Sequence, residues 1–443
     1  MNNAFDFKQK NNFNLDVDLL DSSQKSAVTS EENNILIRAS AGSGKTTVLI
    51  NAVANYRYQR INDRICAITY TRAARAEMEE RLNKMGIYDV EVTTIHVWAR
   101  NLLEKFALKY NFKIKIMQEN QIKFILQDLI DLHRVKRKPK TKVNLGVLYS
   151  FITGNKNMDI TDSYRRVLMT LEDMYKQYKR DNMLYDFTDY PLYLYDVMTT
   201  YDEYIYDIDA LFVDEFQDVD SIQFELFEKV FARKKFFIGD GWQSIFGFRG
   251  ADGEVFNKLE DFSLYKLKYN YRSYQEIINY ACAVYESLLE AVEQCKSCYI
   301  TNVIDCYPSK VKCNKGYGGY VYVFSGSLRD IQVHNDSTKE LNEDDQYAVF
   351  KQMIESNSMI LCRTNKEVKA IQEKNYFNVS TVHQAKGLEY DNVIIIDHEI
   401  NCKEDLNIAY VALTRARNKL LVLNWFDFEY NMKKYKKEKL LEV

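Results

Sequence analysis

The chain has 443 residues, 46% of them apolar and 28% charged, which is typical of a soluble globular protein with about three domains. A net charge of −3 argues against a uniformly basic coat for nucleic acid, although a local basic patch would be hidden in that sum. The amino terminus lacks a basic region followed by an apolar run, and no stretch reaches membrane-spanning length. We therefore expect a cytoplasmic protein, of bacterial or viral origin, that has no membrane partner.

The predicted elements of the first half of the chain are apolar runs that each lead through a polar or glycine-rich turn into a helical pattern. These runs are residues 34–39, 65–69, 210–213 and 235–238. Such alternation predicts an α/β fold: a parallel sheet, helices on both faces and a site at the carboxyl ends of the strands.

The segment 104–183 differs, because it carries long amphipathic helix patterns and only one proline, Pro139. It is predicted to be a helical insertion within the first lobe. Its basic stretch at 133–142 is either a phosphate-contacting loop or a solvated loop, and both interpretations stay open.

A second set of apolar runs, at 358–362, 392–397 and 419–425, predicts a second α/β lobe. The division between the lobes is expected near residue 263, and the basic tail is expected to be frayed. The predicted domains are 1–103 and 184–262 for the first lobe, 104–183 for the insertion, 263–429 for the second lobe and 430–443 for the tail.

The eight cysteines are expected to be reduced thiols, because no secretory context is visible. Four of them, Cys295, Cys298, Cys306 and Cys313, form a cluster that could hold a tetrahedral zinc. The first pair has the C-x2-C spacing of zinc ligands, but the second pair has C-x6-C spacing. We therefore favour buried thiols over a zinc site.

The sequence ASAGSGKTT fits the phosphate-binding loop pattern, with Ala39 in the place of the first glycine. Small residues let backbone N–H groups close around a phosphate at a helix N-terminus, while Lys45 reaches the β- and γ-phosphates and Thr46 binds Mg²⁺. The loop follows a predicted strand and precedes a helical pattern, as this chemistry requires. The residues expected to contact the nucleotide are Ala39, Ser40, Ala41, Gly42, Ser43, Gly44, Lys45, Thr46 and Thr47.

A second motif, LFVDEFQD, places two carboxylates at the end of a predicted buried strand. Asp214 is positioned to hold Mg²⁺, and Glu215 to activate the attacking water. Two neighbouring carboxylates can also mark a solvated strand end, but their pairing with a phosphate loop favours a nucleotide-hydrolysing site.

A third motif, GDGWQSIFGFRG at 239–250, is unusual for a turn, because it contains Trp242, Phe246 and Phe248. A turn that only reversed the chain would favour small polar residues. These rings are therefore expected to pack against something, either a ligand or the protein core.

The order of these motifs, together with TYTRAARAEM, TIH, LKYNYRS, STVHQAKGLEYDNV and YVALTRAR, resembles the UvrD/Rep/PcrA family of superfamily 1 DNA helicases. The resemblance runs from about residue 20 to residue 425. It implies two RecA-like lobes with a 1B-like helical insertion, and an ATP-dependent 3′-to-5′ translocase and helicase that acts on single-stranded DNA and 3′-tailed duplex.

The resemblance also assigns residues around ATP and Mg²⁺. It implies that Gln24 reads adenine, that Tyr271 stacks on it and that Glu389 contacts the ribose. Gln243 would sense the γ-phosphate, and Arg272 and Arg415 would be arginine fingers.

Other motif positions would contact DNA by the same resemblance. Tyr70, Phe246 and Phe248 would stack on bases, which binds every sequence because each base has a π face. Backbone or base contacts would come from Thr94, His96, Arg363, Asn365 and His383. Trp242 stands where the family usually has an acidic or small residue, and the motif assigns it no role.

Larger relatives have a further domain, termed 2B, where this chain has only residues 366–380. Fifteen residues form a helix and a turn but no core of their own. We therefore expect a monomeric motor that needs a protein partner for long unwinding. An RNA-directed motor and an ATPase that remodels proteins on DNA without processive unwinding stay open as alternatives. A regulatory ATPase without nucleic acid is disfavoured, because it would leave the stacking aromatics without a role.

Overall fold

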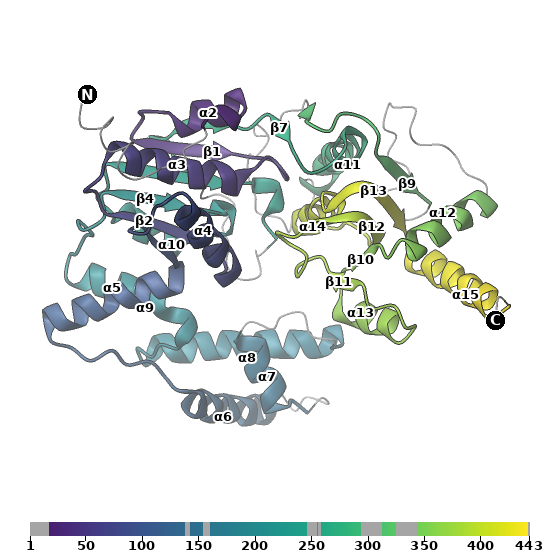
Figure 1. Cartoon of the computed structure of the whole chain (residues 1–443). Coiled ribbons are helices and arrows are strands. Elements are labelled where there is room, and N and C mark those ends of the chain that lie inside the picture. Colours follow the sequence, from purple (N-terminus) through teal and green to yellow (C-terminus); the bar gives the residue numbers. More distant parts are fainter. Residues whose placement is uncertain are drawn as a thin grey trace.

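The computed structural model describes residues 17–137, 142–153, 160–245, 255, 258–293, 312–324 and 343–441. Two α/β lobes lie side by side, and a group of helices extends from the first lobe (Figure 1). This arrangement confirms the predicted fold class. Within these described ranges, no helix combines the length and the apolar character that crossing a membrane requires.

The first lobe is built on a sheet of parallel strands in the order β3-β2-β4-β5-β1-β6. The strands are β1 (Asn34–Arg38), β2 (Ile65–Thr69), β3 (Glu91–Thr94), β4 (Ala210–Val213), β5 (Lys234–Gly239) and β6 (Ser263–Lys266). Every residue of β2 and β4 is buried, because helices cover both faces of the sheet. One face packs on α2 (Ser22–Val28), α3 (Lys45–Gln59) and α4 (Arg72–Lys84), and the other on α5 (Ile95–Tyr110), α9 (Tyr190–Thr200) and α10 (Ser221–Glu228).

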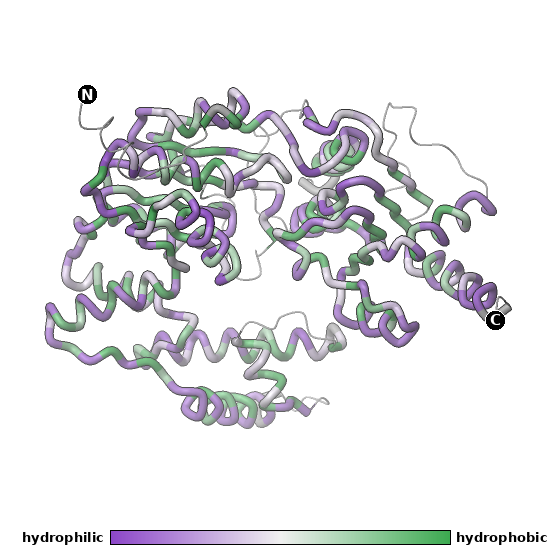
Figure 2. The backbone as a smooth tube through the Cα atoms, viewed as in Figure 1, coloured by the Kyte–Doolittle hydropathy of each residue, from purple (hydrophilic) through white to green (hydrophobic). Residues whose placement is uncertain are grey.

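The second lobe has a parallel sheet in the order β11-β10-β12-β13-β9. Its strands are β9 (Tyr320–Val323), β10 (Met359–Cys362), β11 (Val379–Thr381), β12 (Tyr390–Ile396) and β13 (Ala416–Leu423). Its helices are α11 (Gln275–Glu293), α12 (Glu343–Glu355), α13 (Asn365–Gln372), α14 (Lys403–Leu413) and α15 (Trp425–Leu441). A parallel ribbon of β7 (Tyr269–Asn270) and β8 (Lys312–Cys313) lies beside α11. In both lobes the hydrophobic segments concentrate in the sheets and in the helix faces turned toward them (Figure 2).

The helical insertion consists of α6 (Glu119–Arg137), α7 (Leu145–Ile152) and α8 (Asp162–Asp181) around a core of its own. The predicted boundary at residue 104 falls inside α5, which is continuous to Tyr110. Its apolar positions Leu103 and Phe106 pack in the core of the first lobe. The core of the insertion instead begins at Met117.

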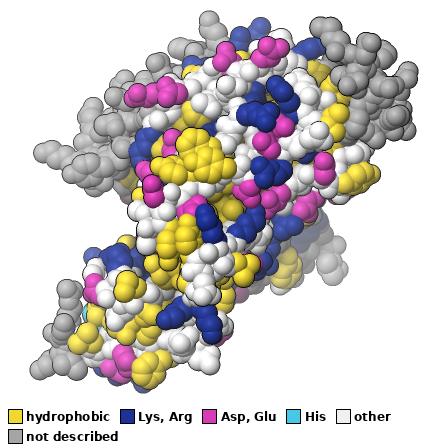
Figure 3. Space-filling model, turned by 90° about the vertical axis from the view of Figure 1, so that its left-hand side faces the viewer, with side chains coloured by type: hydrophobic (Ala, Val, Ile, Leu, Met, Phe, Trp, Pro, Cys, Tyr) yellow, Lys and Arg dark blue, Asp and Glu magenta, His cyan; other side chains and the backbone are white. Residues whose placement is uncertain are grey.

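Aromatic rings join the insertion to the first lobe. Tyr185, which follows α8, stacks on Tyr193 of α9 with ring centres 4.0 Å apart. Just beside this junction, within the first lobe, Tyr110 at the end of α5 stacks on Tyr201 at 3.9 Å. Figure 3, which shows this side of the molecule, has hydrophobic side chains gathered among charged ones from the first lobe down to the insertion. Ring stacking at Tyr185 and Tyr193 therefore holds the end of the insertion against α9 of the first lobe.

Two other predicted boundaries also differ from the structure. Strand β6 begins at Ser263 but pairs with β1, so the first lobe continues to Lys266. The basic tail is not frayed, because α15 continues to Leu441 and buries Phe428 and Met432 in the core of the second lobe. The spacing of these two side chains places them on one face of the helix, which binds the helix to the lobe.

Candidate active site

The phosphate-loop motif forms the turn between β1 and α3. Gly42 and Gly44 have φ angles of +69° and +79°, a left-handed conformation that glycine adopts without strain. Gly44 is the N-cap of α3 and no side chain caps this helix, so its first N–H groups are open to a ligand. The Ser40 hydroxyl is buried and has no hydrogen-bond partner among the described residues. An uncapped helix N-terminus next to an unsatisfied hydroxyl fits a bound phosphate.

Three carboxylates surround the loop, because β1, β4 and β5 are adjacent and end at the same edge of the sheet. Asp214 and Glu215 follow β4, and Asp240 follows β5. The Lys45 ammonium lies 4.0 Å from the Asp240 carboxylate. Burial and the neighbouring Glu215 raise the pKa of Asp214 to about 7. Asp214 is thus a buried carboxylate short of positive charge, which suits a Mg²⁺ ligand.

Glu215 is partly buried and differs from the buried Asp214 in its pKa. Burial alone would raise its pKa, but the charges of Lys45 and Lys386 and a hydrogen bond from Gln217 lower it. A carboxylate that stays ionised can accept a proton from water. Glu215 also has a φ angle of +48°, which is rare for a residue with a side chain and orients it away from the line of the strand.

A polar network links the two motifs of the first lobe. Gln217 donates to Glu215 and accepts a hydrogen bond of 2.8 Å from the Asp240 N–H. The Gln243 side-chain amide donates to the carboxylate of the same Asp240. Gln243 is therefore connected through Asp240 to Lys45 and the phosphate loop.

The second lobe brings its cations to this network. The Arg415 guanidinium is fully buried and donates to the side-chain amide oxygen of Gln243 at 3.2 Å. Burial and the nearby Arg272 lower the pKa of Arg415 to about 9, so it stays charged at neutral pH. Lys386 donates to Asp218 at 2.6 Å and to the Gln243 backbone oxygen at 2.8 Å.

Arg272 lies beside the phosphate loop and is held by Glu389. The Arg272 Nε donates to Glu389 at 2.6 Å, and Arg417 donates to the same carboxylate. Burial alone would raise the pKa of Glu389, but its hydrogen bonds to Arg417 and Arg272 lower it. In this structure Glu389 thus orients the predicted arginine finger.

The ribbon of the second lobe also touches the phosphate loop directly. Asn270 donates to the Ala41 oxygen at 2.6 Å, and the Tyr271 N–H donates to the Gly42 oxygen at 2.8 Å. A Cβ atom at Gly42 would lie 2.7 Å from the Arg272 Cβ. The two lobes are therefore in contact at the loop, and glycine is required there for space as well as for conformation.

The predicted base-binding residues meet at the N-terminus of α2. The Gln24 amide donates to the Ser43 oxygen at 2.9 Å, next to the phosphate loop. Tyr271 is partly exposed, and its hydroxyl donates to Asp21 at 2.6 Å. Asp21 also caps α2 by accepting from the N–H groups of Ser23 and Gln24. Asp21 therefore joins Gln24 and Tyr271, although no motif singled it out.

The predicted DNA contacts lie at the carboxyl ends of paired strands in each lobe. In the first lobe, Tyr70 follows β2, while Thr94 and His96 lie at the junction of β3 and α5. In the second, Arg363 and Asn365 follow β10, and His383 follows β11. Phe246 and Phe248 lie outside the described residues.

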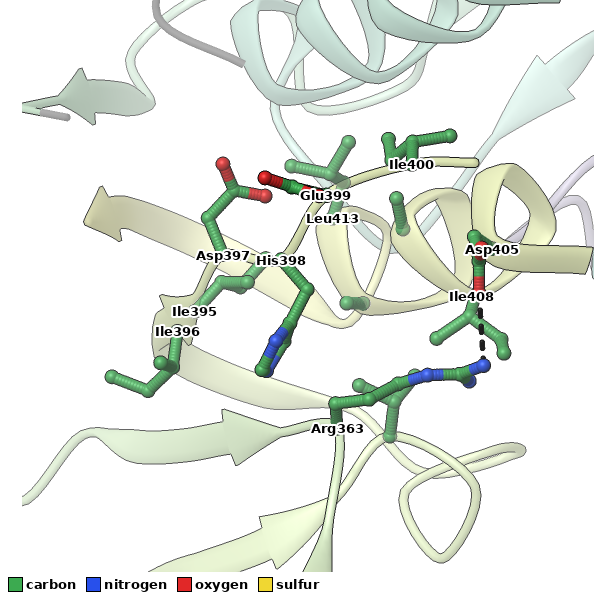
Figure 4. Close-up of a pocket in the computed structure, with 13 residues that line it drawn as sticks. Arg363, Ile395, Ile396, Asp397, His398, Glu399, Ile400, Asp405, Ile408 and Leu413 are labelled. Carbon is green, nitrogen blue, oxygen red and sulfur yellow. Dashed lines mark hydrogen bonds and ion pairs between the residues drawn. The ribbon is translucent and has the colours of Figure 1, made fainter. Parts of the chain in front are cut away.

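Arg363 borders a cavity of about 40 Å³ at the end of β12. Its guanidinium points toward Asp405, to which it donates at 2.9 Å, whereas Asp397 and Glu399 point away from it (Figure 4). This space holds only one or two water molecules. It is too small for a nucleotide, so the cavity is not the nucleotide site.

The structure describes one of the four cysteines of the cluster, Cys313. Cys295, Cys298 and Cys306 lie outside the described residues, and Cys313 is buried beside Ile278 and Cys282. Within the part of the chain that the structure describes, no group of His, Cys, Asp and Glu is arranged to hold a metal ion.

Comparisons with known proteins agree with this geometry. The model of the UvrD/REP helicase N-terminal domain matches residues 20–263, which is more than half of the chain. The chain belongs to the UvrD/Rep helicase family. The model of the UvrD-like helicase C-terminal domain matches residues 328–425. The resemblance inferred from the motif order is therefore confirmed.

Curated relatives are similar over different shares of their length. A probable DNA helicase of Mycoplasma pneumoniae is 25% identical over 91% of this chain and 83% of its own length. DNA helicase II of Rickettsia typhi is 28% identical over 57% of this chain and 42% of its own length. ATP-dependent DNA helicase PcrA of Leuconostoc citreum is 28% identical over 80% and 48%. The chain thus spans less than half the length of the last two.

Proposed function

We propose that this chain is an ATP-dependent motor that moves 3′ to 5′ on single-stranded DNA and unwinds 3′-tailed duplex. The observation that carries the proposal is the contact of Arg415 and Lys386 from the second lobe with Gln243 of the first. Cations that reach from one lobe to a phosphate-sensing glutamine on the other couple the state of the nucleotide to the separation of the lobes.

Each residue of the site has a proposed role in hydrolysis. Lys45 binds the β- and γ-phosphates, and Glu215, kept ionised by Lys45 and Lys386, takes the proton of the attacking water. Arg415 and Arg272 stabilise the charge that develops on the transferred phosphoryl group. Thr46 and Asp214 would hold Mg²⁺, which neutralises phosphate charge when bound.

The proposed DNA path joins the two lobes at the strand ends. Tyr70, Thr94 and His96 contact the strand on the first lobe, and Arg363, Asn365 and His383 contact it on the second. Phe246 and Phe248 complete the proposal by stacking on bases. As the lobes close on ATP and open after hydrolysis, the DNA-contacting residues of one lobe move relative to those of the other.

A second candidate function is remodelling of DNA-bound proteins without processive unwinding. The connection between β10 and β11 favours it, because residues 363–378, all of them described, form only α13 and a short turn. A motor without a further domain at this point has little surface with which to hold duplex ahead of the junction.

The deciding experiment compares ATP hydrolysis alone, with single-stranded DNA and with RNA of the same sequence. We expect stimulation by DNA and less by RNA. No stimulation by either polymer would contradict the proposal, and equal stimulation would favour the RNA-directed alternative. Phe248→Ala is expected to keep basal hydrolysis and to lose the stimulation.

Unwinding and assembly are tested with the same protein. Single-turnover unwinding is measured on 3′-tailed and 5′-tailed duplexes of equal length over a range of protein concentrations. We expect activity on the 3′ tail only, and saturation when each DNA end has one protein. A cooperative rise beyond that point would contradict a monomeric motor. Protein displacement without unwinding would favour the remodelling function.

A further inference from the structure

Trp242 is a residue of the first lobe that packs in the core of the second. It belongs to the turn after β5, next to Gln243, yet its neighbours are buried side chains of α11 and α14. Its ring stacks on Tyr285 with centres 3.9 Å apart and planes 10° apart, and it meets Tyr410 edge-on at 5.2 Å. Only 5% of Trp242 is exposed.

The residues after Trp242 strengthen this attachment. The Ser244 backbone oxygen accepts a hydrogen bond of 2.8 Å from Asn407, and Asn407 in turn accepts one of 2.7 Å from the Tyr285 hydroxyl. Ile245 is fully buried in the same core. The turn is therefore bound to the second lobe on both sides of Gln243.

The attachment also fixes the distance between Gln243 and Arg415. Tyr410, against which Trp242 packs, lies on α14 one turn before the end of the helix. Arg415 follows that end, and its Nε donates to the Val411 oxygen at 2.8 Å. Ring packing at Tyr410 thus sets where the Arg415 guanidinium stands relative to the Gln243 amide.

We propose that Trp242 is a positioning residue for hydrolysis, which holds Gln243 in register with Arg415 by anchoring the turn of the first lobe in the second. The inference rests on the proposed function, because it gives Trp242 a part in that reaction. An acidic or small side chain at this position could not fill the apolar space between Tyr285 and Tyr410.

The main test separates positioning from nucleotide binding. In Trp242→Ala we expect kcat to fall by about 10- to 100-fold, because small misplacements of a catalytic group have effects of this size. Affinity for ADP should stay close to that of the natural chain, since the phosphate loop belongs to the first lobe. Trp242→Phe, which keeps a stacking ring, should recover most of kcat. Trp425→Phe is the control, because Trp425 packs in a different cluster of the second lobe.

Two kinetic results would overturn the inference. One is an unchanged kcat in Trp242→Ala. The other is an equal loss in the alanine and phenylalanine variants, because a stacking ring would then have no effect on hydrolysis.

A second measurement does not depend on hydrolysis. With Trp98→Phe and Trp425→Phe, Trp242 becomes the single tryptophan. Its emission should be that of a buried indole, protected from acrylamide, and adding Tyr285→Ala and Tyr410→Ala should expose it. An exposed indole before those two changes would overturn the anchoring itself. Conversely, a protected indole in a protein that hydrolyses no ATP would contradict the proposed function but not the anchoring.

Discussion

The two lobes bring opposite charges to the site that they share. Among the described residues, the first lobe contributes the cation Lys45 and the carboxylates Asp214, Glu215, Asp218 and Asp240. The second contributes the carboxylate Glu389 and the cations Arg272, Lys386, Arg415 and Arg417. Buried like charges repel, and neither set is balanced alone. The site is therefore completed by contact between the lobes, and the following changes test that division of charge.

The largest effect is expected for Arg415→Ala. It removes a buried cation that reaches Gln243 from the second lobe, so kcat should fall by about 10³ to 10⁵ while ADP still binds. Steady-state hydrolysis and equilibrium binding of a fluorescent ADP measure the two quantities. Lys45→Ala should weaken both, because Lys45 belongs to the phosphate-binding lobe.

Arg233→Ala serves as the control for Arg415, since Arg233 is an exposed arginine of the first lobe. It should hydrolyse ATP normally. Near-normal hydrolysis in Arg415→Ala would mean that the site does not need the second lobe.

The next effect is expected at the buried ion pair between the lobes, Lys386 and Asp218. Lys386→Met leaves Asp218 without its partner, a change that typically costs about 3 to 5 kcal/mol. It should lower both the thermal unfolding midpoint and basal hydrolysis. Asp218→Asn added to Lys386→Met should restore part of the stability, because the unpaired charge is gone.

Lys179 provides a matched control, because it is also buried and pairs with Asp186 at 2.9 Å and Asp189 at 2.6 Å. That cluster lies where the insertion joins the first lobe. Lys179→Met should lower the unfolding midpoint but keep basal hydrolysis. An equal loss of hydrolysis in both lysine variants would mean that Lys386 is only structural.

A third effect concerns pH. The folded-state pKa of Asp214 is raised to about 7, so its contribution to stability is present below its ordinary pKa and is lost as pH rises through 7. Asp214→Asn has no charge to bury, and its stability relative to the natural chain should therefore increase from pH 5 to pH 8. Over this pH range the gain is at most about 3 kcal/mol, because the natural chain loses stability only up to the folded pKa of about 7. Hydrolysis should be lost. The unfolding midpoints of the variant and of the natural chain, measured from pH 5 to pH 8, give this difference in stability. A difference that does not change with pH would contradict the raised pKa of Asp214.

The smallest effect is expected for Asp21→Ala. It frees Tyr271 and removes the cap of α2, a change worth about 1 kcal/mol. KM for ATP should rise a few-fold and discrimination against GTP should weaken, with kcat retained. Asp220→Ala is the control, since Asp220 caps α10 in the same way but away from the base-binding residues. If KM for ATP rose equally in both variants, the loss of a helix cap, and not the contact of Asp21 with Tyr271, would explain the effect.

The sequence predicted the strands at the centre of each sheet but not those at the edges. The predicted strands became β1, β2, β4 and β5 of the first lobe and β10, β12 and β13 of the second. The strands β3, β6, β9 and β11 were not predicted, and all four lie at sheet edges. Central parallel strands are buried on both faces and are therefore continuous apolar runs, whereas β6 alternates buried and exposed positions and β11 has only three residues.

The same contrast applies to the site. The phosphate loop and its carboxylates could be recognised because their chemistry is tied to local spacing, whereas Arg415 was assigned only by the family resemblance. Lys386 lies in the motif STVHQAKGLEYDNV, but its pairing with Asp218 depends on how the lobes meet. The anchoring of Trp242 also depends on Tyr285 and Tyr410, which are remote in sequence. Spacing along the chain contains no information on such contacts.

Gly42 shows what this contact means for the evolution of the chain. A phosphate loop alone would ask only for a residue that accepts a left-handed backbone, and asparagine sometimes does so. Here Arg272 and Asn270 of the other lobe also leave no room for a side chain. The backbone conformation and the contact with the other lobe therefore each favour glycine at position 42. Even a substitution that the loop alone would tolerate should be excluded there. A lineage that enlarged this residue would have to change both lobes together.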